Sequence, residues 1–255
     1  NDELWRIIGV FNNIDDGTGD KETRIKIIRS ESIGSYSWDN KPIAVGSSTS
    51  VYGSNDWSDS TLQQVLNSGA YWNRTSGECP SGENGATVSC DFSEIGLTDE
   101  AKSMMGSVLW NVGGHPDGSP YTASRFYISE RDKVVYNGRP TTWNGKVGLM
   151  YPSDYGYATS GGSMGQNTCL NYSLGEWNNY NDCFNNNWLY TNQNKWTLTS
   201  QFDIGSGAVY INGQMTNTNY VNARYDIYPS AYLISTIEII AGTGLFNDPY
   251  ILLVD

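Results

Sequence analysis

Gly148-Leu-Met-Tyr-Pro-Ser-Asp-Tyr-Gly-Tyr157 is the stretch of this sequence that best indicates its fold, together with Gly242-Thr-Gly-Leu-Phe-Asn-Asp-Pro-Tyr-Ile251 close to the end of the chain. Neither stretch carries a group that the sequence marks as reactive. Glycine, proline and aspartate supply backbone conformations that turns require. We therefore interpret both stretches as parts of the architecture.

Other segments of the chain extend this pattern. Three lie in the second half, Trp196–Ser200, Ala208–Gly213 and Ala223–Leu233, while Leu4–Phe11 and Arg24–Ile33 look like an opening hairpin. In these segments, which cover about half of the chain, the sequence resembles a family of secreted surface domains that are common in Gram-positive gut bacteria. The last third of that family is similar to C-type-lectin-like modules of the formylglycine-enzyme and phage-receptor-binding type.

The resemblance implies a C-type-lectin-like α+β fold with short strands, long loops and terminal strands that lie side by side. Leu4–Phe11 and Tyr250–Val254 would then be neighbouring strands of one sheet, because an apolar terminal strand needs a partner for its backbone groups. Relatives of this group occur as free-standing surface modules and behind prepilin-type helices. The resemblance therefore implies a bacterial cell-surface or pilus-type protein.

Length and charge limit the classes of protein to which the chain can belong. Its 255 residues suffice for one domain with a full core, residues 1–255, and an N-terminal lobe (1–145) with a C-terminal lobe (146–255) is the alternative. The net charge of −12 argues against binding to nucleic acid or to an anionic membrane surface. No long apolar run and no charged, apolar leader is present, so we expect no membrane insertion and interpret the chain as a mature ectodomain.

The four cysteines indicate an oxidising compartment. Cys79 and Cys90 bracket one polar, glycine-containing loop, and Cys169 and Cys183 bracket another. Neither spacing is that of a zinc site, and the sequence has only 1 histidine to complete one. Four cysteines allow three pairings, of which we favour Cys79 with Cys90 and Cys169 with Cys183, in an extracellular protein. Four free thiols in a cytosolic protein are the alternative.

Patterns of apolar residues predict helices early in the chain and strands late. One helix runs from an N-cap at Ser58 to Asn67, and a second runs from an N-cap at Thr98 through Leu109 until Gly113. Together they would be the two helices of the first half, and a hairpin precedes them. Short strands are predicted at Val147–Tyr151, Trp196–Thr199, Ala208–Ile211, Ala223–Ile227, Ala231–Leu233, Ile237–Ile240 and Tyr250–Val254. This arrangement predicts an α+β domain.

Few residues could carry catalysis. His115, the only histidine, could be a general base beside Asp117 or a solvated loop residue. Asp154 and Asp226 could form the carboxylate pair of a glycoside hydrolase, although a turn and a strand position explain them more simply. Ser163 lacks the strand-to-helix setting of a nucleophilic serine. We therefore predict no catalytic residue.

Calcium is considered for one acidic loop. Asp15–Asp20 contains several aspartates, whose carboxylates are hard oxygen ligands, within a few residues. Its spacing departs from the calcium-loop pattern, and a solvated hairpin turn explains the acidic residues better. We expect no cofactor and no metal requirement.

The segment from Gly161 to Asn194 is the candidate ligand-binding region. It contains no Lys or Arg and is rich in asparagine and aromatic residues, a composition suited to sugar rings or to protein surfaces. We predict that recognition of an uncharged glycan, or of a host or bacterial surface protein, involves Trp177, Tyr180, Trp188 and Tyr190. The preferred function is a non-catalytic adhesin. A structural pilin that contacts other pilus subunits and a carboxylate-dependent glycoside hydrolase are the alternatives.

Overall fold

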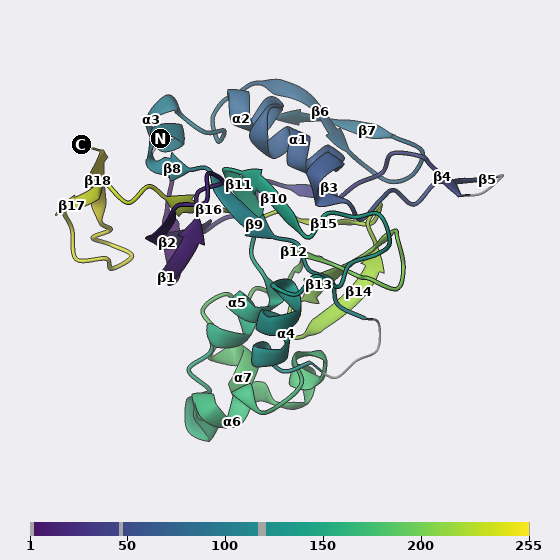
Figure 1. Ribbon diagram of the computed structural model, residues 1–255. Coiled ribbons are helices and arrows are strands. Elements are labelled where there is room, and N and C mark those ends of the chain that lie inside the picture. The colour runs from purple at the N-terminus through teal and green to yellow at the C-terminus, as the bar shows by residue number, and fades with distance from the viewer. Residues whose placement is uncertain (1–2, 46–47, 117–120, 255) are drawn as a thin grey trace.

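An antiparallel sheet joins the beginning, middle and end of the chain. The computed structural model describes residues 3–45, 48–116 and 121–254. Within them, β1 (Trp5–Asp15), β2 (Lys21–Arg29), β16 (Pro229–Leu233) and β11 (Val147–Leu149) lie side by side in that order, and β8 (Met105–Gly106) pairs with the far end of β16. We call this the central sheet (Figure 1).

The β1–β2 hairpin confirms the predicted opening hairpin, with Trp5 opposite Arg29 and Asp15 opposite Lys21. Its turn is shorter than expected because β1 continues through Asn12 and Asn13, where the register shifts between Phe11 and Ile14. Asn13 has a left-handed backbone (φ 58°), as the extra residue of a bulge often requires. In the turn, the Asp15 and Asp16 carboxylates accept hydrogen bonds from Gly17 and Thr18, as in a solvated hairpin turn.

A second sheet lies next to the central sheet. Its order is β14 (Thr216–Tyr220), β13 (Gly207–Asn212), β12 (Asn194–Ser200), β15 (Arg224–Asp226) and β3 (Ser35–Ser37). β12 and β15 run parallel, and the other neighbours are antiparallel. Both sheets combine strands from before and after residue 145.

Four two-stranded antiparallel sheets contain the remaining strands. They are β4 (Ile43–Val45) with β5 (Ser48–Ser50), β6 (Ser76–Pro80) with β7 (Thr87–Asp91), β9 (Val108–Asn111) with β10 (Thr142–Gly145), and β17 (Ile237–Ala241) with β18 (Ile251–Val254).

The helices are short and form two groups on opposite sides of the sheets (Figure 1). The first group is η1 (Trp57–Asp59), α1 (Thr61–Asn67), α2 (Ala70–Asn73) and α3 (Asp99–Met104). The second group is α4 (Ala123–Glu130), α5 (Pro152–Tyr157), η2 (Gly162–Met164), α6 (Gln166–Leu170), η3 (Leu174–Asn179) and α7 (Asn181–Asn185). Helices grouped apart from mainly antiparallel strands confirm the α+β class. The C-type-lectin-like assignment stays a prediction.

Two apolar cores follow from the two faces of β2. Successive side chains of a strand point to opposite faces, so Ile27 packs in a core beneath α1, while Ile28 packs in a second core among α4–α7. The fully buried side chains Trp38, Leu62 and Trp196 belong to the first core, and Tyr155 and Trp177 to the second.

The predicted second helix is wrong beyond Met104. Thr98 caps α3 as expected, accepting a hydrogen bond from the Ala101 N–H, but the chain then forms β8 and β9. The physical reason is that Val108 and Trp110 also alternate with period two, and both are buried by strand pairing. The first helix starts at Thr61 with Ser60 as its cap, not at Ser58. Other helices were not predicted: α2 and α4 in the first half, and α5, α6 and α7 in the second.

The predicted pairing of the two terminal strands is also wrong. β1 pairs with β2, whereas β18 pairs with β17 in a separate two-stranded sheet. The last strand satisfies its backbone groups within its own hairpin, which stands at the edge of the molecule (Figure 1).

This arrangement predicts that the last strand contributes little to stability. Removal of residues 250–255 should lower the melting temperature by only a few degrees, because β18 touches the first core through the partly buried Leu252. Ala231→Asp, which places a charge in the fully buried middle of β16, should unfold the protein or lower the melting temperature far more. Thermal unfolding of both variants measures the difference. Unfolding of the truncated protein would contradict the peripheral placement of β18.

Candidate functional site

The predicted aromatic residues do not form one exposed face. Trp177 has 0% exposed surface and packs against Tyr155, so it belongs to the second core, and the prediction that it contacts a partner is wrong. Its physical role is to fill the space beneath the loops of this region. Tyr180 stacks on Tyr172 at 3.8 Å between ring centroids and is partly exposed.

Trp188 and Tyr190 are partly exposed and also pack against the second core. The backbone carbonyl of Trp188 accepts a hydrogen bond from Arg6, and Tyr190 packs against Phe184. The involvement of Tyr180, Trp188 and Tyr190 in binding therefore stays a prediction.

The two predicted disulfides are confirmed. The S–S distances are 2.11 Å for Cys79–Cys90 and 2.02 Å for Cys169–Cys183. The first joins β6 to β7, and the second joins α6 to α7 beside Trp177. Disulfides persist in oxidising compartments, so the pairs indicate a non-cytoplasmic protein.

The other candidate residues lie apart from one another. His115 is buried, with its ring against Tyr121 and Phe126, so the alternative of a solvated loop residue is wrong. Asp117, its proposed partner, lies outside the described residues. The Ser163 hydroxyl donates to Asp182.

Asp154 and Asp226 have different partners. Asp226 accepts a hydrogen bond from the Ser35 hydroxyl in the second sheet, whereas Asp154 belongs to a buried network beside the central sheet. Asp154 and Asp226 thus share no hydrogen-bond or ion-pair partner in the part of the chain that the structure describes.

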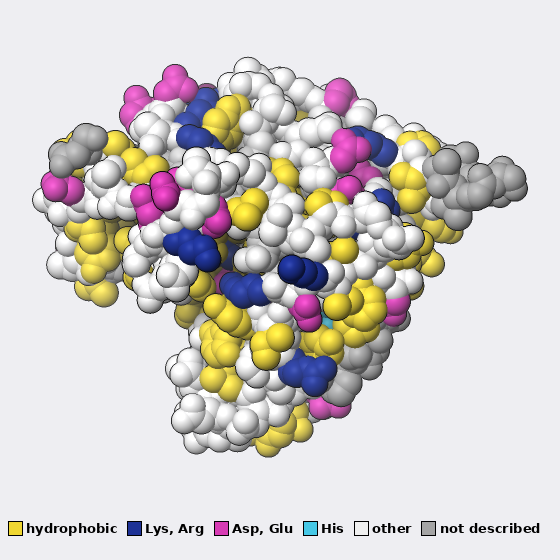
Figure 2. Space-filling model, viewed as in Figure 1, with side chains coloured by type: hydrophobic (Ala, Val, Ile, Leu, Met, Phe, Trp, Pro, Cys, Tyr) yellow, Lys and Arg dark blue, Asp and Glu magenta, His cyan; other side chains and the backbone are white. Residues whose placement is uncertain are grey.

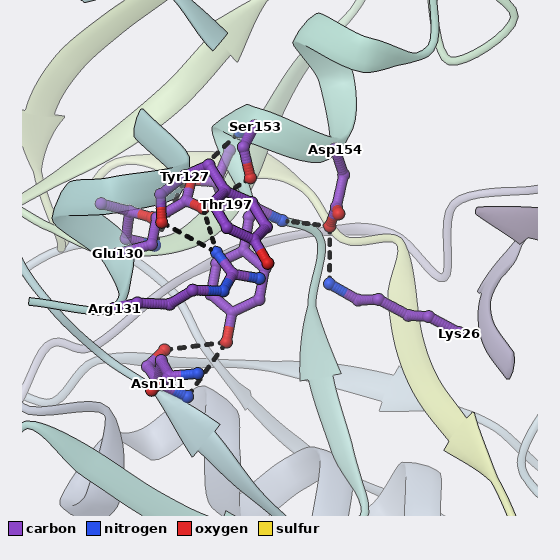
Figure 3. Close-up of polar contacts among 10 residues, drawn as sticks. Lys26, Asn111, Tyr127, Glu130, Arg131, Ser153, Asp154 and Thr197 are labelled. Atoms are coloured by element: carbon purple, nitrogen blue, oxygen red, sulfur yellow. Dashed lines mark hydrogen bonds and ion pairs between the residues drawn. The ribbon is translucent and has the colours of Figure 1, made fainter. Parts of the chain in front are cut away.

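The centre of that network is the ion pair of Lys26 and Asp154, whose Nζ and Oδ2 atoms are 2.6 Å apart (Figure 3). Lys26 lies on the face of β2 that also carries Ile28, and its side chain has 0% exposed surface. The ammonium group lies 4.1 Å from the ring centroid of Tyr151 and near the rings of Trp110 and Tyr232. Burial lowers the pKa of Lys26, and the Asp154 charge opposes this shift.

Asp154 also fixes the start of α5. Its Oδ2 atom accepts a hydrogen bond from the Tyr151 N–H at 2.7 Å, one of the donors that a helix leaves free in its first turn. The sequence Tyr-Pro-Ser-Asp thus forms a capped helix start, with Pro152 at the first position. The Asp154 carboxylate therefore contacts both β2, through the Lys26 ammonium group, and the start of α5, through the Tyr151 N–H.

A second buried carboxyl, Glu130, was not predicted from the sequence. It ends α4, accepts hydrogen bonds from the N–H and hydroxyl of Ser153, and contacts Arg131 Nη1 at 3.1 Å. Burial raises the pKa of Glu130 to about 7 against the opposing effect of Arg131. The sequence contained one indication, because Glu130 shares the apolar face of α4 with Ala123 and Phe126.

A cleft of about 600 Å³ lies above this network. Residues from β1, β9, β16, the end of α4 and the start of α5 line it: Val10, Phe11, Asn12, Asn13, Ile14, Leu109, Trp110, Asn111, Tyr127, Arg131, Tyr151 and Tyr232. Figure 2 shows Lys and Arg side chains among apolar ones on this face, with some Asp and Glu side chains nearby, where the part with β1 and β9 meets the part with α4–α7.

The rings of Tyr151, Trp110 and Tyr232 form the floor of the cleft, and contacts with Asn111 and Lys26 hold these rings in place. The Tyr151 hydroxyl donates to the Asn111 carbonyl at 2.8 Å and accepts from the Asn111 N–H at 3.1 Å. Lys26 lies behind the rings of Tyr151, Trp110 and Tyr232. The floor is therefore a fixed aromatic surface.

Arg131 forms one wall of the cleft and is 22% exposed. Its Cζ atom lies 3.5 Å from the ring centroid of Tyr127, and Nη1 donates to the Tyr127 carbonyl and to Glu130 (Figure 3). Tyr127 itself is 41% exposed at the rim.

Comparisons with protein-family models, with curated proteins and with solved structures find no match. α4, the longest described helix, has 8 residues, and no described helix meets the length and hydropathy that a membrane span requires. Within residues 3–45, 48–116 and 121–254, no group of three or more His, Cys, Asp or Glu side chains is placed to hold a metal ion.

The buried Glu130 predicts a specific dependence of stability on pH. The folded protein binds the Glu130 proton more tightly than the unfolded chain, whose pKa is near 4.5. This contribution is full below pH 4.5 and is lost as the pH rises through about 7. Relative to Glu130→Gln, the free energy of unfolding of the wild type should fall by roughly 3 kcal/mol between these limits.

Urea unfolding of the two proteins at several pH values measures this difference, and other titrating groups cancel in the comparison. Parallel curves for the wild type and Glu130→Gln would show that folding does not raise the pKa of Glu130.

Proposed function

We propose that this chain is a non-catalytic extracellular domain of a bacterial surface that binds a glycan, and that the cleft between β1, β9 and α4 is its binding site. The single observation that supports the site most strongly is the combination of an open volume with aromatic and amide side chains. Binding pockets are mostly apolar, with a few polar groups that fix orientation. The two disulfides support the extracellular placement.

The lining suits a sugar ring because such a ring has apolar faces and polar edges. Trp110, Tyr127 and Tyr232 offer aromatic surface to the faces. The exposed Asn12 and Asn13 offer amide groups to hydroxyls. The bulge in β1 presents these two residues at the rim, and bulges commonly redirect side chains in this way.

The site is also ordered before any ligand binds. Asn12 Oδ1 accepts a hydrogen bond from the Thr23 hydroxyl at 2.8 Å, which fixes the amide while its N–H groups have no partner among the described residues. Tyr127 is held against the Arg131 guanidinium. Side chains fixed in advance lose less conformational entropy on binding.

The proposal predicts that Tyr127→Ala weakens binding to a glycan on an array of neutral and charged glycans by tenfold or more, while the melting temperature changes little because Tyr127 is exposed. Tyr157→Ala is the matched control, since Tyr157 is similarly exposed but does not line the cleft. Tyr180→Ala tests the loop region predicted from the sequence. Loss of binding in Tyr180→Ala with normal binding in Tyr127→Ala would place the site in that region.

One observation favours the pilin alternative as a second candidate. The β17–β18 hairpin exposes Ile239, Ile240, Leu245, Phe246, Tyr250, Ile251 and Leu253, and Phe246 is 81% exposed. Exposed apolar patches of this kind mark contact surfaces. A pilin subunit would use the hairpin against another subunit.

This second candidate predicts association that depends on protein concentration. Analytical ultracentrifugation should show oligomers of the wild type and monomers of the Leu245→Ser/Phe246→Ser variant, with Tyr157→Ser as a control that associates normally. A wild-type protein that stays monomeric at high concentration would contradict the pilin candidate and leave the glycan-binding proposal unaffected.

A further inference from the structure

Arg131 is the only charged residue among the described residues that line the cleft, and none of them is acidic. This is unusual in a chain with a net charge of −12. The buried charges behind the floor, Lys26 and Asp154, compensate each other. The charge that faces the cleft is therefore positive.

The neighbour of Arg131 compensates that charge only in part. Glu130 is fully buried, and burial raises its pKa to about 7, so a large share of its carboxyl groups is protonated near neutral pH. The charged groups that face Glu130 are Arg131, Asp154 from α5 and Lys26 from β2. An anionic ligand group in the cleft would thus meet the Arg131 guanidinium, whose positive charge Glu130 neutralises only in part.

The guanidinium group is also placed for such a ligand. Nη1 is occupied by Glu130 and the Tyr127 carbonyl. Nε and Nη2 have no hydrogen-bond partner among the described residues, and neither is a buried unsatisfied atom. The ring of Tyr127 at 3.5 Å and that of Tyr151 at 5.4 Å hold the guanidinium plane. Two parallel N–H groups on a fixed plane match the two oxygens of a carboxylate.

We infer that the cleft binds a glycan that carries a carboxylate, and that Nε and Nη2 of Arg131 hold this carboxylate as a bidentate pair. The inference rests on the proposed glycan-binding function and specifies its ligand as a sugar acid. The aromatic floor then covers one face of the sugar ring, while Asn12 and Asn13 reach its hydroxyls from the rim.

Isothermal titration calorimetry with the whole chain tests the inference. The probes are sialyllactose, a galacturonate trisaccharide and a glucuronate-containing disaccharide, each compared with its methyl ester, which keeps the sugar and removes the charge. At least one acid should bind, and its ester should bind at least tenfold more weakly. Arg131→Gln should reduce binding of the acid to the level of the ester. Arg131→Lys should bind between the two, because it keeps the charge and loses the paired geometry.

Arg125→Gln is the matched control and should bind as the wild type does. Arg125 lies on the same helix, also contacts a tyrosine ring, and does not line the cleft. If Arg131→Gln fails to fold, the comparison of acid with ester on the wild type still decides the question.

The outcomes separate this inference from the proposed function. If acid and ester bind equally and Arg131→Gln binds normally while Tyr127→Ala does not, the cleft binds a neutral glycan and the sugar-acid inference is overturned. If no glycan binds but a peptide with a free C-terminal carboxylate binds through Arg131, both the sugar-acid inference and the glycan proposal are overturned. If nothing binds, both are likewise overturned.

Discussion

The buried ion pair of Lys26 and Asp154 is the contact on which the arrangement of this protein depends. It joins β2, near the beginning of the chain, to the first turn of α5, and it lies where the central sheet meets the second group of helices. A lysine taken fully out of water is tolerated only with a partner, so either residue alone would leave an uncompensated charge. The rings of Tyr151, Trp110 and Tyr232 surround the ammonium group and exclude water from it.

The surroundings of this ion pair also form part of the cleft surface. The same three rings form the floor of the cleft, so the groups that shield the lysine are the groups that a ligand would meet. Glu130 and Ser153 extend the network to α4, and Arg131 extends it from there to the wall of the cleft. Core and candidate site are thus parts of one connected set of contacts.

The sequence allowed the positions of most strands in the second half to be predicted, because alternation and turn residues are local properties. It also allowed the Thr98 cap and both disulfides to be predicted. It could not distinguish helix from strand after Met104, since Val108 and Leu109 continue the helical spacing while Val108 and Trp110 also alternate with period two. The deciding partners β10 and β16 are distant in sequence. Nor could it show which aromatic residues of the loop region face inward, as Trp177 does.

The cleft could not be predicted for a related reason. Asn12 and Asn13 have the composition of a turn, and only the bulge in β1 turns them into rim residues. Glu130 on an apolar helix face was the one local indication of the network. Where several distant segments each contribute one or two residues, composition and spacing contain too little information to locate a site.

The position of β16 between β2 and β11 has a consequence for biosynthesis. β16 follows β2 at a long distance in the sequence, yet it is the strand that pairs with β2. Until Pro229–Leu233 has been translated, the edge of β2 that faces away from β1 has no strand to pair with. Tyr232, one of the rings that surround Lys26, is also missing until then. Such long-range pairing slows folding, because a large loop must close before the contacts form. The central sheet therefore cannot be completed until Pro229–Leu233 has been synthesised and has paired with both β2 and β11.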